Sequence, residues 1–370
     1  MTTDRIDQDT MHMLQSEPTA PELDLSWLEP GTAWGMTASP GRRGLTVDEI
    51  NKSEAYGLAP DESDNRDMRP RGAAARDAVP RSAYFLRDKA DTWSQNASLL
   101  YEEAVQRQWS SATDIPWETL KPLPDDVERA MCQFCTFLTE VEFIAGDVPS
   151  SWLPKISNDH YEVKLFLASQ VMDEARHLDV FRKRALANGG GLLLSSGNAG
   201  LRFVMDSQDF TEMSSILHVQ GEGLVQSIFR MGEYIANSPA EKRIFRLAAQ
   251  DESRHVAFGV MHLKYILETQ PWRREEIHGY LDYAEPAIQG GSAGGVAAGS
   301  PNFGTSLGVL FSYKLGSQQE GQNMTMAAFR RQMKEYMHRL EVAGLPERKQ
   351  RVGPQFKMML EEAMEGDARL

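Results

Sequence analysis

The feature that most constrains this chain is a short sequence that occurs twice. It reads Asp-Glu-Ala-Arg-His at residues 173–177 and Asp-Glu-Ser-Arg-His at residues 251–255. In each copy a Glu and a His stand three residues apart, which puts both side chains on one face of a helix and within reach of one ion. A single pair means little, but two copies with the same flanking Asp and Arg predict a dinuclear carboxylate site in a four-helix bundle.

The segments around both copies have the periodicity of helices, and no segment shows the alternation of a strand. We expect four bundle helices near residues 127–147, 160–188, 208–237 and 239–269, arranged as two consecutive hairpins. Residues 84–112 suggest one long helix or two short ones before the bundle. The predicted fold class is therefore all-α, a four-helix bundle with additional N- and C-terminal helices.

The predicted organisation has four parts. Residues 1–80 are rich in Pro, Gly, Asp and Arg without a sustained period, which predicts an irregular or partly disordered N-terminal arm. Residues 81–284 form the bundle that carries the site. Residues 285–305 predict a Gly-rich flexible loop or lid, and residues 306–370 predict C-terminal helices that pack on the bundle.

The site needs one more carboxylate from the first helix of each hairpin. In the second hairpin the natural choice is Glu222. In the first hairpin the candidates are Glu140 and Glu142, and periodicity favours Glu142 because it continues an apolar, buried stripe. The predicted catalytic and metal-binding residues are Glu142, Glu174, His177, Glu222, Glu252 and His255.

Such a ligand set suits particular metals. Four carboxylates neutralise two divalent ions, and mixed oxygen and nitrogen ligation suits iron or manganese, whose open positions accept O2. We therefore expect two Fe ions, with a Mn/Fe pair as the alternative, and O2 as co-substrate. Without metal the four carboxylates would repel one another severely in an apolar core, which supports the presence of the ions.

The residues beside the ligands suggest supporting roles. Asp173 and Asp251 can each accept the free ring N–H of a ligand His on a neighbouring helix. Arg176 and Arg254 can hold those Asp side chains, although ordinary salt bridges on the helix surface are the alternative. His218 lies one turn before Glu222 and is either a further ligand or proton donor, or a side chain packed or hydrogen-bonded elsewhere.

Other residues near the site have two readings each. Gly221 and Gly223 cost a helix roughly 1 kcal/mol each relative to Ala, so they make sense where the cluster or a neighbouring helix comes close. Trp109 and Trp117 either wall a substrate channel or pack in the core.

The composition excludes some functions. A net charge of −14 argues against a nucleic-acid or membrane-surface binder, which needs a basic footprint. Only two cysteines occur, three residues apart on an apolar stretch, which suits a reducing compartment. With no long apolar run and no signal peptide visible, we expect a cytoplasmic protein without nucleic-acid or membrane partners.

At these residues the chain resembles the ferritin-like di-iron carboxylate superfamily. The Asp-Glu-x-Arg-His form is similar to hydroxylase subunits of bacterial multicomponent monooxygenases. The length and helix layout look more like the small subunit of class I ribonucleotide reductase, its ligand-binding oxidase relatives and the arylamine N-oxygenases. The resemblance implies a ferritin-like fold and a non-haem di-iron oxygenase or oxidase. Its small organic substrate would be oxidised through a peroxo or high-valent metal–oxo intermediate.

The resemblance also implies partners and alternatives. Electrons would come from an external donor such as a ferredoxin or a flavin reductase, and we expect a homodimer. The alternative functions are iron storage or detoxification, and a ligand-binding oxidase without the tyrosine cross-link. We expect a dry substrate pocket lined by Phe143, Phe166, Val225, Phe229 and Phe258.

Four positions depart from these relatives. Phe181 stands where the reductase has its radical Tyr, and Leu217 where the ligand-binding oxidases have a cross-linked Tyr. Ala248 replaces the additional His of the N-oxygenases, and Gln226 replaces a Thr of many monooxygenase hydroxylases. A tyrosyl radical and a tyrosine cross-link at those two positions are therefore excluded.

Overall fold

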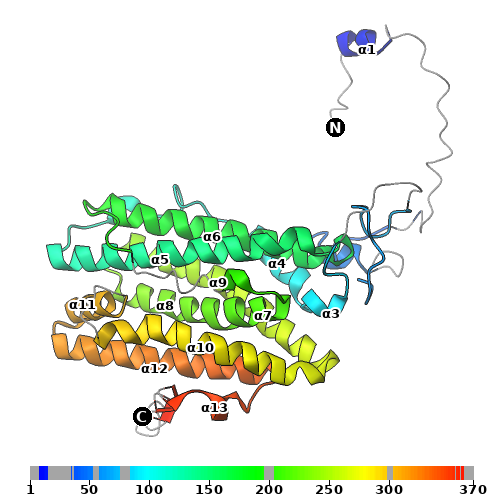
Figure 1. The fold of residues 1–370 in the computed structure, drawn as a ribbon. Coiled ribbons are helices and arrows are strands. Elements are labelled where there is room, and N and C mark those ends of the chain that lie inside the picture. Colours follow the sequence, from blue (N-terminus) through cyan, green and yellow to red (C-terminus); the bar gives the residue numbers. More distant parts are fainter. Residues whose placement is uncertain are drawn as a thin grey trace.

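The secondary structure of the described residues is almost entirely helical. The computed structural model describes residues 8–15, 35, 37–52, 58–75, 84–195, 204–297, 303–354, 356–358 and 360–361. Across these residues, pairing between extended segments is limited to isolated bridges, such as the one between Leu86 and Ile156. The predicted all-α class is confirmed, with long helices stacked side by side (Figure 1).

The first hairpin consists of α5 (Asp125–Trp152) and α6 (Tyr161–Ala187). Acidic residues in the first turn favour the start of α5, because they complement the positive end of the helix dipole. The helix continues past its predicted end through Pro149, which removes only one backbone donor near the terminus. After α6, Gly189 has φ 83°, a left-handed conformation that stops the helix at little cost.

The second hairpin begins with an interrupted helix. It consists of α7 (Phe210–Ser214), a π-helical segment η6 (Ser215–Gly221) and α8 (Glu222–Ile235). Its partner α9 (Pro239–Thr269) has the predicted bounds and starts with a capping box, in which Ser238 and Glu241 bind each other's backbone N–H.

Shorter helices precede the bundle. The segment 84–112 contains two short helices, α3 (Lys89–Thr92) and α4 (Ala97–Gln106). The predicted N-terminal arm contains α1 (Gln8–Gln15) and α2 (Val47–Ile50). Its described residues are held at the start of α6, where Asn51 donates to Glu162 (2.9 Å) and Ser63 donates to Asp159 (2.7 Å).

Further helices follow the bundle: α10 (Arg274–Ala297), α11 (Phe303–Leu315), α12 (Gln318–Ala343) and α13 (Arg348–Arg351). The predicted loop over 285–305 is therefore wrong for 285–297, which lie in α10, and for 303–305, which lie in α11. Residues 298–302 fall outside the described residues. Glycine disfavours a helix by only about 1 kcal/mol per residue. Glu285 fixes α10 at this point, because it accepts hydrogen bonds from Tyr336 (2.8 Å) and Arg348 (2.9 Å).

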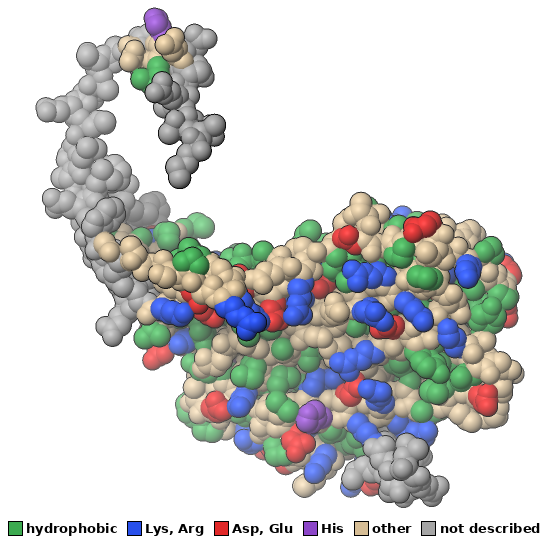
Figure 2. Space-filling model, turned by 180° about the vertical axis from the view of Figure 1, so that it is seen from behind, with side chains coloured by type: hydrophobic (Ala, Val, Ile, Leu, Met, Phe, Trp, Pro, Cys, Tyr) green, Lys and Arg blue, Asp and Glu red, His purple; other side chains and the backbone are tan. Residues whose placement is uncertain are grey.

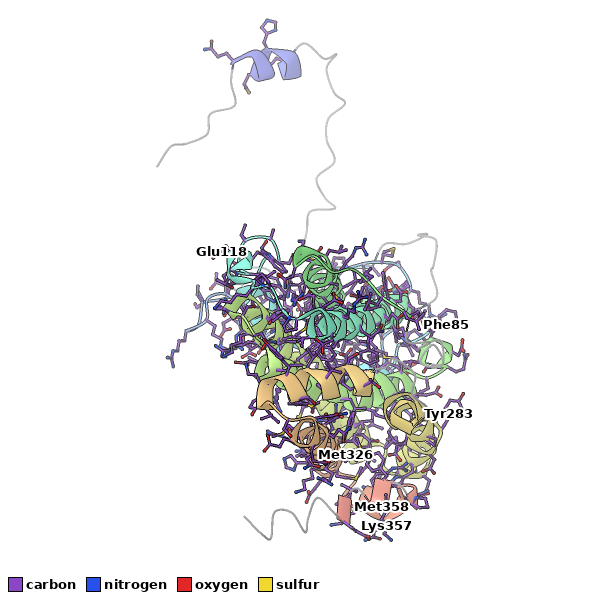
Figure 3. The ribbon with its side chains drawn as sticks, turned by 90° about the vertical axis from the view of Figure 1, so that its left-hand side faces the viewer. Phe85, Glu118, Tyr283, Met326, Lys357 and Met358 are labelled. Carbon is purple, nitrogen blue, oxygen red and sulfur yellow. The ribbon has the colours of Figure 1, made fainter. Side chains whose placement is uncertain are left out.

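The helices stack in three layers. Figure 1 shows α5 and α6 in the upper layer, α8 and α9 in the middle and α10 and α12 below. In the end view of Figure 3, Glu118 lies near the upper edge, Tyr283 of α10 and Met326 of α12 lie lower, and Met358 lies near the lower edge. The two bundle hairpins therefore face each other, with α10 and α12 on the outer side of the second hairpin, while α11 packs against α5 and α12.

Two apolar clusters flank the centre of the bundle. One contains Phe181 and Phe229, and the other contains Phe166 and Phe258. The face of the molecule seen in Figure 2 carries Lys and Arg among acidic and hydrophobic side chains. In the part of the chain that the structure describes, no helix has the length and apolar character needed to span a membrane.

Candidate metal centre

The two repeated motifs face each other at the centre of the bundle. Glu174 and His177 lie on α6, and Glu252 and His255 lie on α9. All four side chains are at most 1% exposed. The motif on each helix therefore points inward, as the helical spacing of three residues predicts.

The first helix of each hairpin adds one carboxylate. Glu142 of α5 is 1% exposed and Glu222, the first residue of α8, is 2% exposed. Glu140, the alternative to Glu142, is only half-buried and does not lie with these side chains. The apolar stripe of α5 thus places Glu142 rather than Glu140 beside the repeated motifs.

The six side chains form two overlapping groups of four. In each group the ligand atoms all lie within 4.8 Å of one another. Glu174 and Glu252 belong to both groups, as bridging ligands between two ions would. One group is Glu142, Glu174, His177 and Glu252, and the other is Glu174, Glu222, Glu252 and His255.

The imidazole rings present Nδ1 to the carboxylates. His177 Nδ1 lies 3.2 Å from Glu174 Oε2 and 3.2 Å from Glu252 Oε1. His255 Nδ1 lies 3.2 Å from Glu252 Oε2 and 3.0 Å from Glu174 Oε1. Each His therefore directs the same ring nitrogen toward the Glu of both motifs.

The other ring nitrogen of each His binds an Asp on the opposite helix. His177 Nε2 lies 3.2 Å from Asp251 Oδ2, and His255 Nε2 lies 3.2 Å from Asp173 Oδ2. An imidazole that donates from Nε2 to a carboxylate keeps its lone pair on Nδ1, where a metal ligand needs it. The two Asp residues thus set the tautomer of the two imidazoles across the bundle.

Two buried arginines hold the Asp side chains. Arg254 Nη2 donates to Asp173 (2.7 Å) and to Asp251 (2.6 Å), and Arg176 Nη2 also donates to both carboxylates. Arg176 is 7% exposed and Arg254 is 2% exposed, so neither forms an ordinary surface salt bridge. The four residues make a crossed network that links α6 to α9.

Two side chains that bind the site were not predicted from the sequence: one donates to the crossed network and the other to Glu222. Trp109 donates its indole N–H to Asp251 (2.7 Å), although it was predicted only as channel wall or core packing. Gln170 donates to Glu222 Oε1 (3.1 Å) and lies one turn before Glu174. The position of Gln170 on the buried face of α6 was the signal that could have identified it.

His218 is hydrogen-bonded away from the carboxylates. Its Nε2 lies 3.0 Å from Gln170 Oε1, and its Nδ1 lies 2.9 Å from Ser214 Oγ. Because Gln170 turns its amide N–H to Glu222, its oxygen faces His218, which must donate from Nε2. Both ring nitrogens of His218 are therefore occupied, which agrees with the expected alternative of a side chain hydrogen-bonded elsewhere, and His218 reaches Glu222 only through Gln170.

The glycines near Glu222 and His255 permit close approach. A Cβ at Gly259 would lie 2.4 Å from His218 Cβ, and a Cβ at Gly223 would lie 2.4 Å from Arg339 Cζ of α12. The space beside Glu222 is thus filled by a neighbouring helix, one of the two explanations that the sequence offered. The π-helical turn before Glu222 was not predicted, because seven residues are too few to separate its period from that of an α-helix.

Only some of the residues predicted to line a substrate pocket lie beside the ligand cluster. Phe166, Phe229 and Phe258 are at most 1% exposed, and Phe229 and Phe166 contact the His177 and His255 rings, respectively. Phe143 is 56% exposed and cannot line a buried pocket, because it follows Glu142 and points about 100° away around the helix.

Without cations, the buried carboxylates repel one another, which makes their charged forms unfavourable. Burial, followed by the charge of Glu174, raises the pKa of Glu142 well above its usual range. Burial and Glu252 do the same to the pKa of Glu222. Burial would also raise the pKa of Glu174, but without metal the imidazoles are held protonated by the carboxylates, and their charge, His255 first, keeps the pKa of Glu174 below its usual value. A bound cation would take the place of these protons on Nδ1.

Unpartnered oxygens show that the residues fit metal ions. The Oε1 atoms of Glu142, Glu174 and Glu252 are buried and accept no well-aligned hydrogen bond among the described residues, although those of Glu174 and Glu252 face the imidazole Nδ1 atoms. Buried carboxylate oxygens without partners are costly unless a cation binds them. Together with two oriented imidazoles, they match the oxygen and nitrogen ligation that iron and manganese take.

The fold and the cluster together define a class of structure, the ferritin-like helical bundle with carboxylate and histidine side chains at its centre. Solved structures of R2-like ligand-binding oxidase share this fold. A variant with an anaerobically reconstituted Mn/Fe cofactor has a TM-score of 0.53 at 17% identity, over 68% of this chain and 94% of that chain. Another variant with an aerobically reconstituted Mn/Fe cofactor has a TM-score of 0.54 at 16% identity, over 68% and 95%.

A third variant carries an aerobically reconstituted Fe/Fe cofactor and has a TM-score of 0.52 at 18% identity, over 68% of this chain and 94% of that chain. These likenesses confirm the expected ferritin-like fold. No protein-family model matches the chain, and no curated protein matches it by sequence.

Proposed function

We propose that the protein is a di-metal, O2-activating oxygenase or oxidase that acts on a small organic molecule. The observation that carries the proposal is the pair of overlapping four-ligand groups, buried in the bundle. The solved neighbours, which contain Mn/Fe or Fe/Fe cofactors in this fold, support the same pairs of metals here. Two Fe ions, or one Mn and one Fe, are the proposed cofactor.

The ligand roles follow from the two groups. Glu174 and Glu252 would bind both ions, and Glu142 with His177 and Glu222 with His255 would each complete one position. When bound, two redox-active ions with open positions supply the activation of O2. Asp173 and Asp251 orient the imidazoles for this task.

The surrounding chain protects the reaction. Phe166, Phe229 and Phe258 keep water away from the cluster, which limits proton leakage and the loss of reactive species. The residues at the centre offer no electron carrier of their own, so we assign the electrons to an external donor such as a ferredoxin or flavin reductase.

Metal analysis of the purified full-length chain tests the proposal. We expect about two ions per chain, iron or iron with manganese, as a six-ligand site of this kind requires. Less than about one ion per chain would contradict it. Anomalous scattering recorded at the iron and manganese absorption edges then distinguishes an Fe/Fe pair from a Mn/Fe pair.

A second experiment separates oxidation of a substrate from storage of iron. The storage alternative requires a large hollow shell, whereas an oxygenase of this architecture needs only a small assembly such as a dimer. Light scattering of the metal-loaded protein distinguishes the two sizes. Oxygen consumption that depends on both a reductant and an organic substrate would support the oxygenase, and continuous iron uptake without a substrate would support storage.

A further inference from the structure

A side chain from outside the bundle occupies the space beside Glu222. Gly223 follows Glu222 directly, and a Cβ at Gly223 would lie 2.4 Å from Arg339 Cζ and 2.5 Å from Arg339 Nε. Arg339 belongs to α12, the C-terminal helix that covers the second hairpin (Figure 1). The absence of a side chain at residue 223 therefore lets a guanidinium lie against the backbone at a candidate metal ligand.

This arginine is bound to the π-helical turn. Arg339 is 8% exposed, and its Nε donates to the carbonyl oxygen of Val219 (3.1 Å). Burial lowers the pKa of Arg339 to about 10, so it stays a cation near neutral pH. Its Nη2 is buried without a hydrogen-bond partner among the described residues. A buried cation that is only partly paired is unfavourable for folding, which points to a role other than stability.

A second side chain of the same helix binds on the other side of the ligand. Gln332 lies two turns before Arg339, is 3% exposed and donates Nε2 to the carbonyl oxygen of Leu224 (3.1 Å). Val219 lies three residues before Glu222, and Leu224 lies two residues after it. Two buried side chains of α12 therefore hold the backbone on both sides of one ligand.

The backbone at this ligand needs external support more than the rest of the bundle. The N–H of Glu222 binds the carbonyl of Leu217, five residues earlier, at the junction between the π-helical segment and α8. Single π-turns are rare and interrupt the regular helical hydrogen bonds. Glu142, the matching carboxylate of the first hairpin, lies inside the regular helix α5.

We infer that Arg339 and Gln332 are positioning residues, which hold the π-turn so that the Glu222 carboxylate reaches the metal position completed by His255. The inference rests on the proposed function, because it concerns one of the two proposed metal positions. It predicts that loss of either contact from α12 weakens metal binding at this position. Metal binding at the position completed by Glu142 and His177 should not change.

Manganese(II) titration of the metal-free, full-length chain tests this role, with the electron paramagnetic resonance signal of free Mn(II) as the readout. We expect the wild-type protein to bind about two ions. Arg339→Leu should bind one ion as tightly as the wild type and the other about 10- to 100-fold more weakly, the usual effect of losing support behind a ligand. Gln332→Leu should weaken the same ion.

Gly223→Ala is an independent test of the same contact. Its added Cβ would displace the guanidinium, so it should weaken the same ion without removing any polar group. Because both changes break one contact, the double variant should lose little more than either single variant. Arg331→Ala, on the exposed side of α12, is the matched control and should bind both ions as the wild type does.

The outcomes separate the two proposals. Unchanged binding of both ions in Arg339→Leu and Gly223→Ala would overturn the positioning role and leave the di-metal function intact. Equal weakening of both ions would show general loosening of the bundle, and would also overturn it. A wild-type chain that binds no Mn(II) or Fe(II) would overturn both. If Arg339→Leu fails to fold by circular dichroism, Gly223→Ala and Arg339→Lys decide. Both should weaken one ion relative to the wild type, Lys by less because it keeps the charge, and unchanged binding of both ions in these two variants would overturn the positioning role.

Discussion

The α5–α6 hairpin and the α8–α9 hairpin build nearly matching halves of the metal centre. In both halves the imidazole Nδ1 lies 3.2 Å from the Glu of its own motif. The distance to the first Glu of the same hairpin is 3.9 Å in one half and 3.8 Å in the other. In both halves the imidazole Nε2 binds the Asp of the opposite helix. The repeated motif is therefore sufficient to define a symmetric frame of ligands.

The halves differ where the sequence does not repeat. Gln170, one turn before Glu174, donates to Glu222, whereas the matching position one turn before Glu252 is Ala248, which offers no donor. The Oε1 of Glu142 accordingly has no partner among the described residues. The repeat thus supplies two equivalent sets of candidate ligands, while neighbours outside the repeat make the two positions unequal.

The largest effect is expected at the two shared carboxylates. Glu174→Ala and Glu252→Ala each remove a ligand from both four-ligand groups, so each variant should lose both ions. Metal content should fall from about two ions to well below one per chain. Glu142→Ala and Glu222→Ala should each lose one ion. Elemental analysis of the purified variants measures this.

Glu140→Ala is the matched control for these variants, because Glu140 lies two residues before Glu142 and outside both groups. It should keep both ions. Full metal content in Glu174→Ala would refute the assignment of the bridging ligand, and loss of metal in Glu140→Ala would refute the choice of Glu142.

The next effect concerns stability at two matching positions, seven residues after each His. Arg184 of α6 is charged and paired with Glu128 and Glu241, whereas His262 of α9 is buried and hydrogen-bonded to Thr211 (3.0 Å) and the Trp93 carbonyl. Burial lowers the pKa of His262 from 6.5 to about 4 in the folded state.

The folded chain therefore disfavours protonation of His262 more than the unfolded chain does. This contribution to stability is complete above pH 6.5 and is lost as the pH falls toward 4. The free energy of unfolding should fall by about 3 kcal/mol in this pH range because of His262. The charged groups that act on the ring are Asp209 and Arg273. Urea unfolding of the metal-free chain at different pH values measures this contribution. Between pH 6.5 and 4 the free energy of unfolding should fall less for His262→Gln than for the wild type. An identical pH dependence of the free energy of unfolding in the two proteins would contradict this account.

A smaller effect is expected at the crossed carboxylates. Asp173→Asn should weaken the ion bound by His255, and Asp251→Asn should weaken the ion bound by His177, each by about 10- to 100-fold. The pattern is crossed because each Asp orients the imidazole of the other helix. Metal titration with spectroscopic resolution of the two positions would measure it, and weakening on the same helix as the mutation would be inconsistent with the crossed network.

The smallest effect is expected at Gln170, where the halves differ most. Gln170→Met keeps the volume of the side chain but removes the donor to Glu222, and we expect the loss to lie at the lower end of the roughly 1.5 to 3 kcal/mol for a hydrogen bond to a charged group. The ion at Glu222 should bind about tenfold more weakly, which makes the two positions more alike. Isothermal titration of the metal-free protein would detect this, and equal weakening of both ions would argue against a local role.

The fold was predictable because its signals are local and repeated. The bounds of α9 follow from Pro239 in its first turn and Pro271 after its end, and the helical period continues over the 31 residues of the helix. The helix over 285–297 was not predictable from composition, because the contacts of Glu285 with Tyr336 and Arg348 come from residues far along the chain.

The site was predictable wherever a side chain lies at a fixed helical offset from the repeat. Glu142 was identified from the apolar stripe of its own helix, and Glu222 as the acidic candidate on the matching helix of the second hairpin; the structure places both beside the motifs. Trp109, Gln332 and Arg339 were not identified as partners of the site, because their contacts depend on how loops and outer helices pack against the bundle. Periodicity contains no information about such packing.

The crossed Asp and Arg network has a consequence for the order of events during synthesis. Since each imidazole is oriented by the opposite helix, neither metal position exists until α6 and α9 have docked. The candidate ligands are spread along the chain from Glu142 to His255, so synthesis must have passed His255 before a complete ligand set can form. Under the proposed function, metal would therefore be acquired only after both hairpins have assembled, and metal content would report on that assembly.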